Sequence, residues 1–155
     1  MKLLLATDGS PCSQGVIDEV CTRQWPPNTE VKILTAVFVG GPSFDPIVLT
    51  FAIHELLMKR NRKVAPEIIE KAANQIRECA PALKVETKIV EEDPPKQAIV
   101  EEAERWRADL IMLGSHGYGP MKRFLLGSTV QAVALHAPCS VQIVRPRHLL
   151  EASTP

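Results

Sequence analysis

Short apolar runs alternate along the chain with longer stretches in which apolar residues recur every three or four positions. The short runs are typical of buried strands, and the longer stretches are typical of helices with one apolar face. The pattern predicts strands at residues 3–6, 31–39, 85–90, 110–113 and 140–144. It predicts helices at residues 11–25, 64–79, 95–106 and 128–136. Because helices separate short apolar strands, we expect an α/β fold with a parallel sheet and helices on both of its faces.

The segment 43–60 gives a weaker signal. Residues 47–58 are strongly apolar and are interrupted only by Thr50, His54 and Glu55. This pattern predicts a helix that is too apolar all round for a lone surface helix. We favour a helix packed on the core. A contact with a partner or a mobile cover over a ligand is the alternative.

Composition and organisation narrow the class of protein. No linker, repeat or low-complexity segment divides the chain, so we expect one domain over residues 1–146 and a tail over 147–155. The 18 basic residues balance the 18 acidic ones, which disfavours a nucleic-acid binder. No apolar run reaches the length of a membrane span, and Thr7 and Asp8 interrupt the apolar start too early for a signal peptide. We therefore expect a cytoplasmic protein.

The four cysteines have no metal-site spacing. They form no Cys-x-x-Cys pair, and the histidines do not cluster near them. We expect them to be small apolar residues in a reducing compartment. A redox-sensing Cys12 near a helix start is the alternative. The cysteines are Cys12, Cys21, Cys79 and Cys139.

Polar segments follow two of the predicted strands. Thr7 and Asp8 come after the first strand, and a glycine-spaced segment over 114–129 follows the fourth. Ligands of open α/β sheets bind beyond the carboxyl ends of the strands, where the strand order reverses. A glycine loop that leads into a helix start offers backbone N–H groups to an anion, and phosphate is the obvious candidate. Lys122 and Arg123 could add positive charge to such a site.

A purely structural role of this segment is the alternative. Gly114 and Gly117 would then shape a turn, and Ser128 would cap a helix. Two familiar phosphate motifs are absent. The chain has no P-loop sequence, and Lys122 stands where a dinucleotide fingerprint that starts at Gly117 would need its third glycine.

Gly114 and Gly117 form Gly-x-x-Gly, nine residues follow, and Gly127 and Ser128 come next. This spacing resembles the ATP-binding signature of the universal stress protein family. The opening residues 3–10, Asp93-Pro94 with the helix that follows, and residues 138–144 also resemble the family. The resemblance covers about residues 2–146. Glu92 stands where the family often has Gly, and the segment 41–60 is variable in the family.

The resemblance implies a single three-layer, Rossmann-like domain with the strand order 3-2-1-4-5. Strands 1 and 4 would then be neighbours, with Asp8 beside the Gly114 loop, and these two residues would hold the ribose. Adenine would lie near Ala6, Thr7 and Leu113 and would read the backbone of Val37. The residues near the phosphates would be His116, Gly117, Gly127, Ser128 and Thr129.

The function implied is an ATP-binding regulatory nucleotide sensor in the stress response. ATP, ADP or AMP would be the ligand, with Mg²⁺ or Mn²⁺ held through the phosphates. The family commonly forms homodimers through the fifth strand, here Val141 to Val144, which would be an exposed edge in a monomer. We expect no nucleic-acid or membrane partner, and the sequence identifies no protein partner.

Two other functions stay open. One is slow, Mg-dependent ATP hydrolysis, for which His116 and Asp8 are the only nearby candidates for a base. Because the chain lacks a dedicated set of catalytic residues, we do not expect an efficient enzyme. The other is a dimerising module that binds no nucleotide.

Overall fold

The computed structural model describes residues 1–37, 48–91, 94–117 and 126–145, with the backbone alone for residues 48–61. Its strands form one parallel sheet in the order β3-β2-β1-β4-β5, which confirms the predicted fold class and strand order. The strands are β1 (Lys2–Ala6), β2 (Glu30–Val37), β3 (Lys84–Glu91), β4 (Leu110–Gly114) and β5 (Ser140–Val144). The helices are α1 (Pro11–Thr22), α2 (Val48–Cys79), α3 (Pro95–Trp106) and α4 (Ser128–His136).

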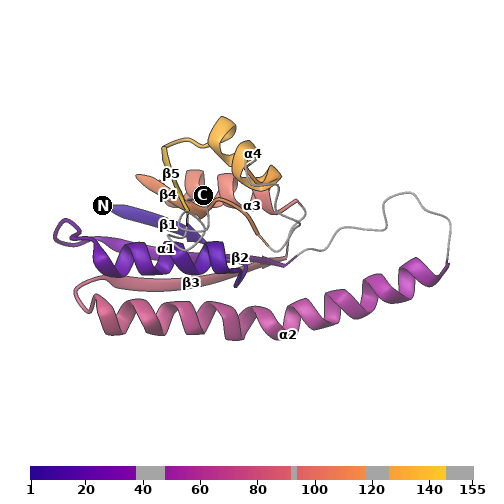
Figure 1. Ribbon diagram of the computed structural model, residues 1–155. Coiled ribbons are helices and arrows are strands. Elements are labelled where there is room, and N and C mark those ends of the chain that lie inside the picture. Colours follow the sequence, from indigo (N-terminus) through magenta and orange to yellow (C-terminus); the bar gives the residue numbers. More distant parts are fainter. Residues whose placement is uncertain (38–47, 92–93, 118–125, 146–155) are drawn as a thin grey trace, which may run out of the picture.

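Two helices cover each face of the sheet (Figure 1). From β1 the chain steps to β2 and β3 in one direction, and right-handed crossovers place α1 and α2 on the same face. It then crosses back to β4 and β5, which places α3 and α4 on the opposite face. Successive strand residues point to opposite faces, so Leu3 and Leu5 pack under α1 and α2, whereas Leu4 packs under α3 and α4.

Helix α2 differs from the prediction. The sequence pattern predicts two helices, over 47–58 and 64–79, but the structure has one continuous helix of 32 residues. Four of the five residues that join the two parts are lysine or arginine, which are good helix formers, and the helix continues through Pro66. The amino-terminal part of α2 runs out beyond the sheet (Figure 1). The side chains of residues 48–61 lie outside the described part, so their predicted packing stays a prediction.

The other element predictions hold with small changes at the ends. The structure adds Lys2 to β1 and Gly114 to β4, and it begins and ends α4 as predicted. Ala134, which the pattern places on the apolar face of α4, is exposed, whereas Val130 and Val133 are buried. Among the described residues, no helix is both long enough and apolar enough to cross a membrane. The predicted tail at 147–155 lies outside the described residues.

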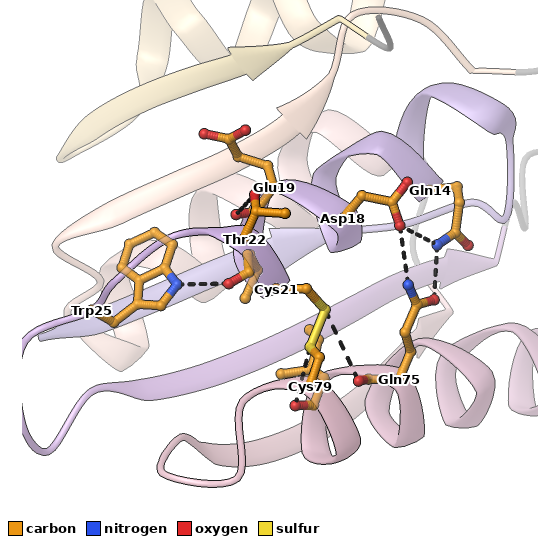
Figure 2. Close-up of a disulfide and its surroundings, with 10 residues drawn as sticks. Gln14, Asp18, Glu19, Cys21, Thr22, Trp25, Gln75 and Cys79 are labelled. Atoms are coloured by element: carbon orange, nitrogen blue, oxygen red, sulfur yellow. Dashed lines mark hydrogen bonds between the residues drawn. A yellow bond between two sulfur atoms is a disulfide. The ribbon is translucent and has the colours of Figure 1, made fainter. Parts of the chain in front are cut away.

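A disulfide contradicts the expectation that all four cysteines are reduced. Cys21 near the end of α1 is bonded to Cys79 at the end of α2, with 5.4 Å between their Cα atoms (Figure 2). Cys12 and Cys139 are free. Helices on one face of a parallel sheet end at the same edge, so the last turns of α1 and α2 come together there. The bond therefore joins the two helices at the edge where the strands begin.

Candidate functional site

A cavity of about 180 Å³ lies at the edge of the sheet where the strands end. Strands β1 and β4 are neighbours there, although the connections that follow them lead in opposite directions across the sheet, which is where α/β folds bind ligands. Apolar lining comes from Ala6, Leu34, Ala36, Pro95, Ile99, Leu113 and Val130. The remaining lining residues are Thr7, Asp8, Ser13, Gly114, His116, Gly117 and Thr129.

The turn after β1 fixes the position of Asp8. The backbone N–H of Thr7 donates to the carbonyl of Leu34 at 2.9 Å and continues the pairing of β1 with β2. The N–H of Ser10 donates to Oδ1 of Asp8 at 2.9 Å, which closes an Asx-type turn. Gly9 adopts φ of 78°, a left-handed conformation that glycine adopts without strain. Asp8 is exposed at the cavity, so its carboxylate is available to a ligand.

Gly114 is required by packing between elements. A Cβ atom at this position would lie 2.6 Å from the carbonyl of Cys12 and 2.8 Å from the N atom of Ser13. The end of β4 therefore contacts the backbone of the first turn of α1. This close approach brings the two polar segments of the sequence prediction together, since Ala6 and Leu113 are register partners in β1 and β4.

Gly117 lies directly beside Asp8. A Cβ atom at Gly117 would lie 2.5 Å from Oδ2 of Asp8, so a side chain here would displace the carboxylate. The start of the loop is held by β5, because the N–H of Ser115 donates to the carbonyl of Val144 at 2.9 Å. The end of the loop is also held at Ser115, because the N–H of Gly127 donates to the carbonyl of Ser115 at 3.0 Å. The glycine-spaced loop therefore begins and ends at one point of the structure.

Two helices start at the cavity without a side-chain cap. The N-cap of α4 is Gly127 and that of α3 is Pro94, and neither makes a side-chain capping bond. Ser128 is the first helical residue, so the alternative interpretation of Ser128 as the cap is wrong. The leading N–H groups of a helix have no partner within the helix, and they carry partial positive charge. The start of α4 can therefore accept an anion.

His116 is half-buried and lines the cavity. Its Nδ1 lies 3.1 Å from Oγ of the buried Ser115. In the described part of the chain, no group of three or more His, Cys, Asp or Glu side chains could hold a metal ion. Among the residues that line the cavity, Asp8 is the carboxylate.

The cavity brings together most of the predicted nucleotide residues. The predicted residues that line it are Ala6, Thr7, Asp8, Leu113, Gly114, His116, Gly117 and Thr129. Three others do not line it. Val37 ends β2 one residue beyond the lining residue Ala36, and Gly127 and Ser128 begin α4 next to Thr129. Gly119, Lys122 and Arg123 lie outside the described residues.

Sequence reasoning missed six lining residues. They are Ser13, Leu34, Ala36, Pro95, Ile99 and Val130. Some of these residues could have been predicted from the fold class. Parallel strands end at one edge of the sheet, and the helices that follow them start there. The last residues of β2 and the first turn of α3 therefore belong to the same edge as Asp8.

Known proteins of one family resemble most of this chain. The model of the universal stress protein family matches residues 1–145. A universal stress protein of Methanocaldococcus jannaschii is 31% identical over 148 residues, which cover 93% of this chain and 81% of that protein. A putative universal stress protein of Staphylococcus haemolyticus is 33% identical over 158 residues, with 99% and 90% covered. A universal stress protein A homolog of Coxiella burnetii is 40% identical over only 80 residues, 50% of this chain and 54% of that protein.

Solved structures share the fold. A universal stress protein from Lactobacillus plantarum matches with a TM-score of 0.70 at 23% identity, over 94% of this chain and 97% of that one. A universal stress protein in complex with cAMP matches with a TM-score of 0.66 at 23% identity, over 94% of this chain and 96% of that one. A family member from Arabidopsis thaliana with AMP bound matches with a TM-score of 0.64 at 18% identity, over 94% and 91%. A fourth, from Archaeoglobus fulgidus in complex with dAMP, has a TM-score of 0.61 at 21% identity, over 92% and 96%.

Proposed function

The chain belongs to the universal stress protein family, and from this premise we propose that it binds an adenine nucleotide in the cavity and acts as a regulatory nucleotide sensor in the stress response. One observation carries the proposal. One cavity is lined by apolar side chains, by Asp8 and by Thr129 in the first turn of α4, a helix that starts without a side-chain cap. A nucleotide has a matching set of parts, namely a flat base, a sugar with hydroxyl groups and an anionic phosphate.

Each part of the nucleotide has a counterpart in the site. Apolar side chains such as Leu34, Ala36 and Ile99 accept the base, which the backbone of Val37 would read at the end of β2. The carboxylate of Asp8 accepts hydrogen bonds from ribose hydroxyls, with Gly114 beside it. Charge-assisted hydrogen bonds of this kind are stronger than neutral ones.

The phosphates belong at the start of α4. Gly127, Ser128 and Thr129 would hold them with backbone N–H groups and hydroxyls, and His116 and Gly117 would line the approach. When bound, Mg²⁺ or Mn²⁺ would neutralise phosphate charge, and the phosphates themselves would hold the ion. Structural neighbours with bound AMP, cAMP or dAMP support an adenine nucleotide as the ligand class.

Thermal unfolding with added nucleotide tests the proposal. A ligand at about 100 times its dissociation constant stabilises the folded state by about 2.7 kcal/mol. We expect ATP, ADP or AMP at millimolar concentration, with and without Mg²⁺, to raise the melting temperature. GTP at the same concentration controls for non-specific phosphate binding. An unchanged melting temperature with every adenine nucleotide would contradict the proposal and favour a module that binds none.

Slow ATP hydrolysis is a second candidate function. The observation that favours it is the position of the His116 ring, which lines the cavity and whose Nδ1 lies within hydrogen-bonding distance of Ser115 Oγ. A base near the phosphates could orient an attacking water. Phosphate release followed over days, and lost in His116→Ala while AMP affinity is kept, would support hydrolysis. Equal release by the variant would rule out this role of His116.

A further inference from the structure

A continuous series of hydrogen bonds runs through the turn that carries Asp8 and involves the buried hydroxyl groups of two cavity-lining residues. The N–H of Gly9 donates to Oγ1 of Thr7 at 3.3 Å, and Thr7 donates to Oγ of Ser13 at 3.1 Å. Ser13 in turn donates to the carbonyl of Ser10 at 2.9 Å. Thr7 is 7% exposed and Ser13 is 4% exposed, so water does not compete well for these bonds.

These bonds hold both ends of one short turn. The turn over residues 7–10 carries Asp8 at the cavity, with Ser10 N–H on Oδ1 of Asp8. Thr7 begins the turn, and the carbonyl of Ser10 ends it. Ser13 lies in the first turn of α1 and bridges the two ends. The other carboxylate oxygen, Oδ2, lies next to Gly117.

We propose that Thr7 and Ser13 are positioning residues, whose hydroxyls hold the 7–10 turn so that Asp8 presents its carboxylate to the two vicinal hydroxyls of a ribose. The inference rests on the proposed nucleotide binding and specifies how that site recognises the sugar. The turn contains Gly9 at positive φ, a residue with many accessible conformations, so other contacts must select one of them. The Thr7–Ser13 bond supplies such a contact from the rigid first turn of α1.

Loss of either hydroxyl has a defined consequence. Ser13→Ala leaves the buried hydroxyl of Thr7 without its acceptor, and Thr7→Val leaves Ser13 without its donor. In both variants the turn can relax, and Asp8 loses its fixed direction. Affinity for the ribose hydroxyls should fall more than affinity for the base and the phosphate. Loss of a residue that only stabilised the fold would lower the affinity for all parts of the ligand equally.

The experiment compares two probes on each variant. Calorimetry measures the dissociation constants of AMP and of 2′,3′-dideoxyadenosine monophosphate, which lacks both hydroxyls. We expect the wild type to bind AMP at least about tenfold more tightly than the dideoxy probe, because hydrogen bonds to a charged group contribute on that scale. We expect Asp8→Asn, Ser13→Ala and Thr7→Val to lower this ratio to about threefold or less. Thr7→Ser, which keeps the hydroxyl, should have the same AMP-to-dideoxy affinity ratio as the wild type.

Thr29→Val is the matched control. Thr29 is fully buried, and its hydroxyl donates to the carbonyl of Pro26 at 2.7 Å, at the start of β2 and away from the cavity. This variant should lower stability as Ser13→Ala does and leave the AMP-to-dideoxy ratio unchanged. Adding Ser13→Ala to Asp8→Asn should change the ratio no further, because both substitutions remove the same interaction.

The outcomes separate the two proposals. If the wild type binds neither probe, the proposed function fails and the positioning role falls with it. If the wild type prefers AMP and Asp8→Asn removes the preference, nucleotide binding stands. In that case, an unchanged ratio in Ser13→Ala, or an equal loss of affinity for both probes, would overturn the positioning role alone.

Discussion

Two glycines of the segment 114–129 have different surroundings. Gly114 packs against backbone, since a Cβ would lie 2.6 Å from the carbonyl of Cys12. Gly127 faces more space, because a Cβ there would meet Ser115 O at 3.5 Å and His116 Cα at 3.6 Å, which are ordinary contacts. Its φ of −59° and ψ of 148° are open to any residue. The first glycine therefore serves the fold, and the second leaves room at the start of α4.

Substitution at these glycines separates the two roles. We expect Gly114→Ala to lower the free energy of unfolding by at least about 2 kcal/mol, because rigid backbone must move. Gly127→Val should keep the fold and weaken nucleotide binding about tenfold or more, equivalent to about 1.4 kcal/mol. Urea denaturation and calorimetry with AMP measure the two effects. Unchanged affinity in Gly127→Val would refute the placement of phosphate at α4.

Glu102 is a buried carboxylate that joins α3 to the sheet. It is 3% exposed, and it pairs with Lys32 of β2 at 3.1 Å, with Lys88 of β3 at 2.7 Å and with Arg105. Lys32 also lies 4.6 Å from the ring centroid of Trp106. Removing one member of a buried ion pair leaves its partners uncompensated. Helix α3 places Pro95 and Ile99 at the cavity, so this cluster supports the apolar side of the site.

We expect Glu102→Ala to lower the free energy of unfolding by about 3 kcal/mol. Its neighbour Glu101 is exposed and accepts a hydrogen bond from Gln97 of its own helix. Glu101→Ala is the control and should change stability by less than about 0.5 kcal/mol. Urea denaturation of both variants measures the difference. Equal losses in the two variants would mean that the Glu102 cluster does not stabilise the fold.

At the residue scale, the sequence predicts positions better than roles. The apolar periodicity places Ile99 and Ala103 on the inward face of α3, and the structure buries both. Glu102 lies on that same face, but periodicity cannot say that two lysines from neighbouring strands neutralise it. Gly114 likewise looks like a ligand-binding glycine in sequence. Only the packing of β4 against α1 reveals the backbone contact that requires it.

At the scale of elements, α1 and α2 are connected at two levels. The disulfide joins their last turns, and hydrogen bonds of Gln75 to Gln14 and Asp18 connect them closer to the cavity (Figure 2). The disulfide could have been predicted from the topology of the sheet and its helices. Both helices lie on one face and end at the same edge, so cysteines in their last turns are neighbours. The spacing of the cysteines along the chain, which showed no motif, could not reveal this.

Reduction of the disulfide should destabilise the protein. The bond closes a loop with a sequence separation of 58, and the chain-entropy model assigns about 4 kcal/mol to a loop of that length. Urea denaturation with and without dithiothreitol measures the effect. A double variant, Cys21→Ser with Cys79→Ser, should already be destabilised and should not respond to the reductant.

Counting thiols provides the control for that experiment. The protein denatured without reductant should expose two thiols, from Cys12 and Cys139, and four after reduction. In the native state Cys139 should react slowly, because partial burial and, to a lesser extent, the charge of Asp109 raise the pKa of its thiol. Four reactive thiols in the denatured, unreduced protein would contradict the disulfide.

At the scale of the whole molecule, β5 is the outermost strand of the described sheet and pairs with β4 alone. An open edge offers backbone groups to a second chain. We propose a homodimer through Val141 to Val144. Since the carbonyl of Val144 also accepts from Ser115 of the glycine loop, the proposed interface and the candidate nucleotide site share a hydrogen bond.

A lysine on this edge should produce a monomer. Gln142→Lys places a charge on the edge strand without entering the apolar core, against which Val141 and Ile143 pack, and sedimentation should change from dimer to monomer. Ile89→Lys, on the opposite edge strand β3, is the matched control and should leave the dimer intact. Melting temperatures confirm that both variants fold. A monomeric wild type at millimolar protein concentration would contradict the proposed interface.

The overall architecture was predictable because strand and helix periodicities alternate cleanly along the chain. The family resemblance then supplied the strand order, which the structure confirms. The site was predictable in outline, since Asp8 and Gly114 come together through the register of β1 with β4. The apolar lining of the site was not predictable, because Pro95 and Ile99 lie at the cavity only as a result of the packing of α3 on β2.

The most direct test of nucleotide binding in the cavity is a titration of the ¹⁵N-labelled protein with AMP, followed by NMR. We predict that the amide signals that move belong to residues around the cavity, such as Ala36, Gly117 and Thr129, and that Thr22 and Cys79 at the disulfide edge stay unchanged. Shifts confined to residues outside the cavity, or no shifts at millimolar AMP, would contradict the account.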